Sequence, residues 1–322
     1  MKEGIFMKTT SHETRKKSYF LFTVGMVLTI LSLFFVLYEY KAGYQESLAI
    51  ASRLSEAKNA LKEVSEGSSA ADTAALQDTI KALSDSKLRA ERPYSYGLTI
   101  LFFSVMLLLK GLHKAFIGSV PAEQTDVKRL ALAGLMAALC YIGFAVFKID
   151  IPVGTEKTAF HLGNVFCVLA ALLLGGFWGG LAGAVGMTIG DLTTAYVTSA
   201  PKTFLLKLLI GLIVGLVAHR IFHLSRSHHA KYVTGVTIFS CICGMGFNVI
   251  ADPLVGYFYK MYLLGIPQQI ASVWAKWGAV TTLVNAIIAV ICSSLFYLAL
   301  RPALKKSGLF IQVTSEAERG NE

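Results

Sequence analysis

Residues 160–192 read FHLGNVFCVLAALLLGGFWGGLAGAVGMTIGDL, two apolar runs joined by the glycine-rich turn GGFWGG. Each run approaches the length of about 20 residues that a helix needs to cross the hydrocarbon core of a bilayer. The turn leaves almost no room for a loop, so the two runs are expected to be neighbouring antiparallel helices. The spacing Gly179-x3-Gly183 in the second run favours close packing of helices in lipid. This stretch therefore predicts a helical membrane protein.

The composition of the whole chain points the same way. Of its 322 residues, 54% are hydrophobic and 16% are charged, against about 25% charged in a typical soluble domain. Eight apolar segments are long enough to be predicted as membrane spans, near 18–38, 94–113, 129–147, 160–175, 178–197, 203–219, 232–257 and 278–300. The fold class expected is an all-α integral membrane protein.

The distribution of Lys and Arg predicts the orientation. They concentrate in segments 1–17, 110–129, 219–231 and 301–322, which the positive-inside rule assigns to the cytoplasm. Both termini are therefore expected inside the cell. This placement accounts for the net charge of +10 without a nucleic-acid partner.

The first two spans are separated from the rest in composition and spacing. Residues 1–117 are predicted to form two spans around an external segment, about 39–93, in which Ile50, Leu54, Ala57, Leu61 and Val64 follow helical spacing. A break at Gly67-Ser68-Ser69 then predicts two amphipathic helices folded back as an external helical hairpin. The hairpin fits a spacer, an assembly element or the input part of a sensor. Residues 118–302 form the predicted six-span domain, and 303–322 form a cytoplasmic tail.

Charged side chains at membrane depth need an explanation, because inserting one costs about 2.5–3.5 kcal/mol. Asp191 and Lys207 lie inside predicted spans, and Asp252 lies close to the end of another. The helical rise places all three in the outer half of the membrane. Each has an ordinary explanation by itself: Lys207 could snorkel to the surface, and Asp252 before Pro253 could break a helix.

Polar residues from several spans nevertheless share one level near the outer surface. His161, which could also be an interface residue at a helix start, and Asn164 open one span, while Asn248 and Asn285 lie at a similar height on two others. The sequence therefore predicts an outward-open substrate-binding pocket formed by His161, Asn164, Asp191, Lys207, Asn248, Asp252 and Asn285. In it, Asp191 and Lys207 would pair with each other or with charges on the ligand. The outer connections 148–159 and 257–276 could cover this pocket, and aromatics of the second, such as Trp274, are by default an interfacial belt.

The sequence carries no motif for ATP hydrolysis and no catalytic motif. A P-loop, an HExxH motif and a GxSxG motif are all absent. The five cysteines fall inside predicted spans, and Cys241 and Cys243 are too closely spaced for a CxxC metal pair. We therefore expect no enzyme, no metal site and no cofactor. Energy would have to come from a partner, and the small residues Ala133 and Ala137, with the parallel pair Gly134 and Ala138, could dock another membrane helix or pack internally.

Residues 130–215 resemble the substrate-binding S components of energy-coupling factor (ECF) vitamin transporters, especially the riboflavin-type group. The resemblance rests on the alanine-rich first helix, on "KIDIPVG", on the stretch quoted above and on "APKTFLLKLLIGLIVGL". It implies a bacterial cell-membrane subunit that captures a small vitamin or precursor, riboflavin-like or other. It also implies partners, namely a transmembrane coupling protein and two ATPase subunits, with Ala133 and Ala137 facing the coupling protein. Asn164 stands where the riboflavin-type pattern commonly has Asp, so the vitamin is not fixed.

Two other functions fit parts of the sequence. In the first, the chain is a sensory membrane protein whose external helical hairpin detects a signal. In the second, it is a stand-alone secondary transporter that needs no ATPase.

Overall fold

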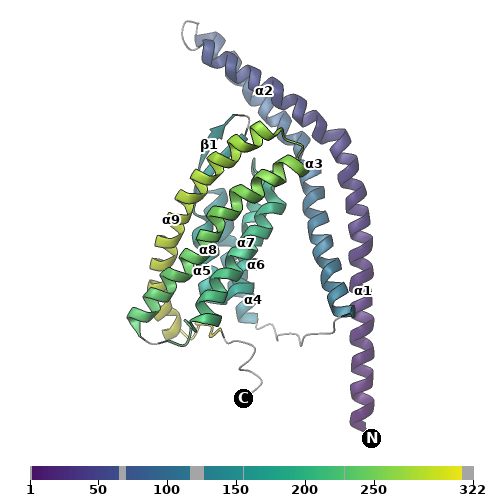
Figure 1. The fold of residues 1–322 in the computed structure, drawn as a ribbon, viewed down its shortest axis with the longest axis vertical. Coiled ribbons are helices and arrows are strands. Elements are labelled where there is room, and N and C mark those ends of the chain that lie inside the picture. The colour runs from purple at the N-terminus through teal and green to yellow at the C-terminus, as the bar shows by residue number, and fades with distance from the viewer. Residues whose placement is uncertain (1, 65–69, 117–126, 155, 228, 314–322) are drawn as a thin grey trace. The chain divides into compact units, whose positions relative to one another are not determined.

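The computed structural model describes residues 2–64, 70–116, 127–154, 156–227 and 229–313 (Figure 1). The chain divides into two compact units, Met1–Gln124 and Thr125–Glu322. The break expected at Gly67-Ser68-Ser69 and the boundary expected between 117 and 118 lie outside the described residues.

The first unit consists of long helices. Helix α1 spans Lys2–Glu39 and continues through the π-helix η1, Tyr40–Tyr44, into α2, Gln45–Val64. Helix α3, Ala70–Phe116, packs against both α1 and α2. Leu54, on the predicted hydrophobic seam, is buried. Where the external helical hairpin meets the spans, Tyr44 stacks on Tyr94 with ring centroids 4.6 Å apart.

One feature of this unit goes beyond what the sequence predicted. The second helix of the hairpin does not end before the second span, because α3 runs through Pro93 without a break. Its inward face is covered continuously, first by α2 and then by α1, so no exposed turn is needed between hairpin and span. The buried ion pair of Lys87 and Glu91, 2.8 Å apart, lies one turn before this proline.

The second unit contains the six predicted helices. They are α4, Val127–Ala145; α5, Gly163–Leu174; α6, Gly176–Thr193; α7, Ala200–Gly215; α8, Ala230–Phe258; and α9, Gln268–Lys306. Short 3-10 and π segments flank them: η2, Val197–Ser199, η3, Leu216–Ile221, and η4, Tyr259–Leu263. The all-α fold class is confirmed.

A β hairpin stands where the sequence predicted only a covering loop. Strands β1, Lys148–Val153, and β2, Glu156–His161, pair antiparallel with Lys148 opposite His161. Ile149, Ile151 and Val153 alternate with other residues, the pattern of a strand, and Gly154 takes a positive φ of 62° at the turn. His161 is therefore the last residue of β2, and α5 begins two residues after it.

Five helical segments of the described chain are long and apolar enough to span a membrane: Phe22–Leu61, Val127–Ala145, Val197–Ile221, Ala230–Leu263 and Gln268–Lys306. Three predicted spans, 94–113, 160–175 and 178–197, lie in helices but are not among these segments. Helix α5 has 12 residues, about 18 Å at the helical rise. Its residues are almost all buried, so protein rather than lipid surrounds it. The glycines of helix α6 lower its mean hydropathy.

Helix α6 packs against three neighbours, α4, α5 and α7, through its glycines. A Cβ added at Gly179 would lie 2.3 Å from Ala171, and one at Gly183 would lie 2.3 Å from Cys167 Sγ, both on α5. Close packing through Gly179-x3-Gly183 is therefore confirmed. On another face, Gly180 meets Gly211 of α7, where an added Cβ would lie 2.1 Å from the Gly180 Cα.

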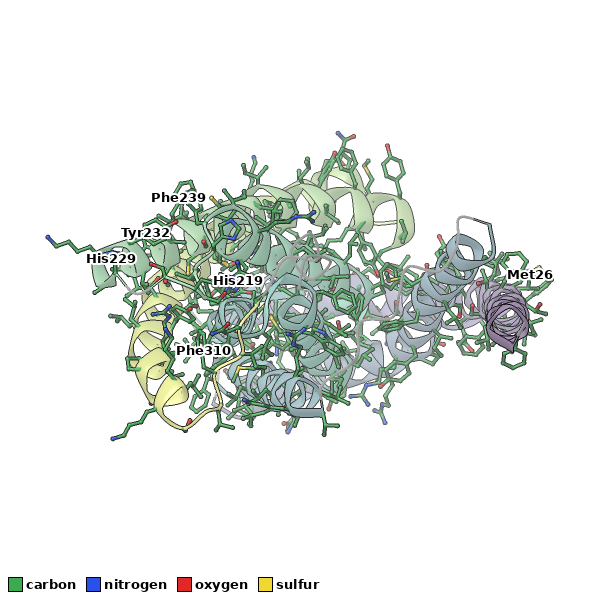
Figure 2. The ribbon with its side chains drawn as sticks, turned by 90° about the horizontal axis from the view of Figure 1, so that it is seen from below. Met26, His219, His229, Tyr232, Phe239 and Phe310 are labelled. Atoms are coloured by element: carbon green, nitrogen blue, oxygen red, sulfur yellow. The ribbon has the colours of Figure 1, made fainter. Side chains whose placement is uncertain are left out.

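The end of the bundle opposite the β hairpin is held by polar contacts with backbone. His219 Nε2 lies 3.0 Å from the carbonyl oxygen of Leu172, in the last turn of α5 (Figure 2). Arg301 donates to the carbonyl of Ser227 at 2.7 Å and lies over the ring of Phe310. Val313 packs over Gly175, the residue that joins α5 to α6. These contacts fix the short α5 and so the height of its first residues.

Candidate functional site

A cavity of about 140 Å³ lies in the second unit, between the β hairpin and helices α4 to α9. The residues predicted as a pocket all line it: His161, Asn164, Asp191, Lys207, Asn248, Asp252 and Asn285. They come from β2 and from five helices, α5 to α9. The structure thus brings the seven side chains together, and their binding role stays a prediction.

Several of these side chains have buried polar atoms without a hydrogen-bond partner. Within the described residues, the unpaired atoms on the cavity are His161 Nδ1, Asn164 Oδ1, Asp191 Oδ2 and Asn248 Oδ1. About nine in ten buried polar groups in proteins are paired, and leaving one unpaired costs about 1–3 kcal/mol. Their convergence on one cavity is typical of a site that binds a polar molecule.

Lys207 adds an ammonium group to the same cavity. The residue is 6% exposed, and among the described residues no carboxylate forms an ion pair with it. Asp191 and Lys207 do not form the ion pair that the sequence offered as one of two alternatives. Instead, the Thr203 hydroxyl hydrogen-bonds to the Asp191 carboxylate. Asp191 and Lys207 therefore both line the cavity without forming an ion pair with each other.

Asp252 and Asn285 differ from the other members because protein groups already engage them. Lys202 Nζ donates to Asp252 Oδ1 at 2.8 Å, and Thr282 donates to Oδ2 at 3.0 Å. Asp252 does not break a helix, since α8 continues past Pro253. Asn285 donates to the carbonyl of Ala159 and accepts from the backbone N–H of His161, each at 3.0 Å. These two side chains hold α7, α9 and β2 around the cavity.

The β hairpin lines the cavity and is tied down on both flanks. Tyr196 donates to Asp150 Oδ1 at 2.8 Å. On the other flank, the hydroxyls of Thr158 and Thr281 are 2.8 Å apart. The first of the two predicted covering connections is therefore a rigid wall of the cavity.

The second connection brings Trp274 to the cavity, whereas the sequence assigned its aromatics by default to an interfacial belt. Trp274 lines the cavity beneath the Lys260 ammonium, which lies 4.4 Å from its ring centroid. Tyr262 and Phe258 are exposed, as expected of an interfacial belt.

Sequence reasoning missed several residues that line the cavity. They are Phe144, Thr158, Met187, Tyr196, Lys202, Thr203, Trp277, Thr281 and Thr282. Helical spacing was the available signal, because Thr203 precedes Lys207 by four residues and Thr281 precedes Asn285 by four. Among the described residues, no group of three His, Cys, Asp or Glu side chains has a metal-binding arrangement.

The small residues of α4 fall on two faces. Ala133 is 7% exposed and belongs to the core, and the carbonyl of Ala137 lies against Gly186 of α6. Internal packing therefore explains Ala133 and Ala137 better than docking of another helix does, because α6 already packs against their face of α4. Gly134 and Ala138 are exposed, and a Cβ added at Gly134 would meet nothing within 4 Å.

Comparison with known proteins gives one match. A family model described as "ECF-type riboflavin transporter, S component" matches residues 124–302, more than half of the 322-residue chain. No curated protein and no solved structure matches the chain. The matched range contains the β hairpin and every residue that lines the cavity.

Proposed function

The chain belongs to the family of S components of ECF-type riboflavin transporters, and from this premise we propose how it binds its substrate and with which partners it works. Membership makes the chain a substrate-binding membrane subunit for vitamin uptake. The finer proposal is that it captures a small vitamin or precursor, riboflavin-like or other, from outside the cell. It then delivers this molecule with a separate coupling and ATPase module.

The observation that carries the proposal is the set of unpaired polar groups on one cavity. Asn164, Asp191 and Asn248 each contribute an unpaired oxygen, and Lys207 contributes an ammonium group. Burying such groups without partners is costly unless a bound molecule completes their hydrogen bonds. The proposed binding residues are His161 and these four, with Asp252 and Asn285 as positioning residues.

The orientation is part of the same proposal. The concentration of Lys and Arg in segments 1–17, 110–129, 219–231 and 301–322 supports cytoplasmic termini. The cavity then opens to the outside, at the end of the bundle where α4 passes into the β hairpin.

Membership of the S-component family supports an energy source on other chains. The proposed partners are a transmembrane coupling protein and two ATPase subunits. Of the two small-residue faces of α4, the one with Gly134 and Ala138 is open to a second membrane helix. We propose this face for docking in place of Ala133 and Ala137.

Two measurements test the proposal: which small molecule copurifies with the protein, and which components its transport requires. We expect mass spectrometry to find a small molecule released from the purified wild-type chain, and none from an Asp191→Asn/Lys207→Met double variant present in equal amount. In proteoliposomes, uptake of that molecule should require the coupling protein and ATP hydrolysis. Uptake by this chain alone would instead establish a secondary transporter.

A truncation separates the transporter from the sensor. All cavity residues lie in the unit Thr125–Glu322, so a chain that begins at residue 120 is expected to bind the copurified molecule with affinity within about threefold of the full chain, a difference under 1 kcal/mol. Isothermal titration in detergent measures it. Loss of binding together with retained helical content would show that the external helical hairpin takes part in recognition, as a sensor requires.

A further inference from the structure

We infer that Lys202 is a positioning residue of the binding cavity: by holding Asp252, it leaves the Lys207 ammonium available to the substrate. This inference rests on the proposed function, in which Lys207 binds the substrate, and it adds one residue to that site. It depends on which of the two lysines Asp252 takes as its partner.

Two cationic side chains and one anionic side chain meet on the cavity between α7 and α8. Lys202 and Lys207 belong to α7, and Asp252 belongs to α8. All three line the cavity. At the helical rise, the two lysines start about 7.5 Å apart along α7, a distance that a flexible four-carbon side chain can largely cover. Either lysine could therefore serve Asp252 as its partner.

The structure pairs Asp252 with Lys202. Lys202 Nζ donates to Oδ1 at 2.8 Å, and Thr282 of α9 donates to Oδ2 at 3.0 Å, so both carboxylate oxygens are engaged. The Lys202 ammonium also lies close to Gly256, one turn further along α8, where it would be 3.5 Å from an added Cβ. Lys202 thus connects α7 with α8 and, through Asp252, with α9.

Lys207 is left without a carboxylate partner. It is 6% exposed, and no ion pair within the described part of the chain includes it. Asp252 nevertheless attracts Lys207 more strongly than Asp191 does. The remaining charged residues of the cavity lie beside the turn of the β hairpin or over the ring of Trp274, and they are Glu156, Lys157 and Lys260. Asp252 is therefore the acid that would compete with a substrate for Lys207.

Removal of Lys202 would start this competition. Asp252 Oδ1 would lose its partner, and a partly buried carboxylate without a partner is strongly unfavourable. Lys207 is then expected to turn toward Asp252 and form the ion pair. A substrate would have to separate the two before it could bind, so it would bind more weakly.

Riboflavin, which the description of the family names, is the probe for a binding test on the full-length protein in detergent. By isothermal titration, Lys202→Met should weaken its binding at least about tenfold, the usual effect of a lost hydrogen bond to a charged group. Adding Asp252→Asn should restore the affinity to within about threefold of the wild type, because no carboxylate then competes for Lys207.

Two control variants accompany this test. Lys202→Arg keeps a cation beside Asp252 and should bind riboflavin like the wild type. Lys276→Met makes the same change as Lys202→Met at an exposed lysine that does not line the cavity, and it should leave the affinity unchanged. The inference is overturned if Lys202→Met retains wild-type affinity. It is also overturned if the added Asp252→Asn restores nothing, since Lys202 would then contact the substrate itself.

Thermal unfolding of the ligand-free protein tests the pairing without any ligand. In the wild-type background, Lys207→Met removes a buried ammonium that has no carboxylate partner and should leave the melting temperature unchanged or raise it. In the Lys202→Met background, the same change removes the new partner of Asp252 and should lower the melting temperature. An equal change in both backgrounds would show that Lys207 does not replace Lys202. A Lys202→Met chain that fails to fold, while Lys202→Met/Asp252→Asn folds, would show the same.

The outcomes separate this inference from the proposed function. If the wild type binds no riboflavin and carries no small molecule, the proposed function fails, while the unfolding experiment still decides whether Lys207 replaces Lys202. If the wild type binds riboflavin but Asp252→Asn does not rescue Lys202→Met, the positioning role of Lys202 is lost and the proposed function stands.

Discussion

The Asp191→Asn variant is expected to bind the copurified substrate about 10- to 100-fold more weakly than the wild type, while it accumulates in the membrane to the same level. Asp191 is 2% exposed, and its Oδ2 has no protein partner. A hydrogen bond to a charged group is worth about 1.5–3 kcal/mol, and each 1.4 kcal/mol is about tenfold in affinity. Asparagine keeps the shape of the side chain, so the loss should be one of binding rather than of folding.

The matched control for this experiment is Asp252→Asn. Both aspartates line the cavity, but Asp252 is already paired with Lys202 and Thr282. Removing its charge leaves the Lys202 ammonium partly buried without its partner, which should lower the melting temperature of the purified protein. Isothermal titration and thermal unfolding of the two variants should give opposite patterns. If Asp191→Asn and Lys207→Met both retain wild-type affinity, these residues do not bind the substrate.

The Gly211→Leu variant is expected to prevent assembly of the second unit. Any side chain at this position meets the backbone of Gly180, because an added Cβ alone would lie 2.1 Å from its Cα. A backbone atom cannot turn away as a flexible side chain can, so α6 and α7 must separate. The cost should exceed about 3 kcal/mol, the upper part of the usual range for overpacking.

Gly246→Leu is the control for this substitution. Gly246 also lies within an apolar helix, but a Cβ added there would meet nothing within 4 Å. Both variants gain helix propensity equally, so only the steric clash separates them. Size-exclusion profiles of the detergent-extracted proteins should show a monodisperse Gly246→Leu and an aggregated or missing Gly211→Leu. Equal profiles would mean that α6 and α7 do not need this close approach.

The helices of the second unit were predictable because apolar length and glycine spacing are local properties of the chain. Residues 160–192 alone indicated two antiparallel helices and the close contact of Gly179 and Gly183, now observed against α5. Helical rise also gave the height of each polar side chain. The β hairpin was missed because its strands are short and because Pro152 within β1 and Gly154 at the turn both read as loop signals.

The faces of the helices were harder to predict than their heights. Ala133 and Gly134 are adjacent in sequence, yet the first is buried and the second is open. Small residues occur on both faces of α4, so composition could not distinguish packing from docking. The pairing of Lys202 with Asp252 was also missed, since it joins residues 50 positions apart on different helices.

By itself, the sequence determined that this protein is a bundle of apolar helices with polar side chains at one level, because hydropathy and helical rise depend only on local order. The tertiary structure decided which of those side chains protein groups engage. Asp252 and Asn285 have partners on α7, α9 and β2, while Asp191 Oδ2 and Lys207 do not find an ion-pair partner in the described chain. The physical reason is that a hydrogen bond depends on the rotation of each helix about its axis and on the course of the β hairpin, both of which long-range packing sets.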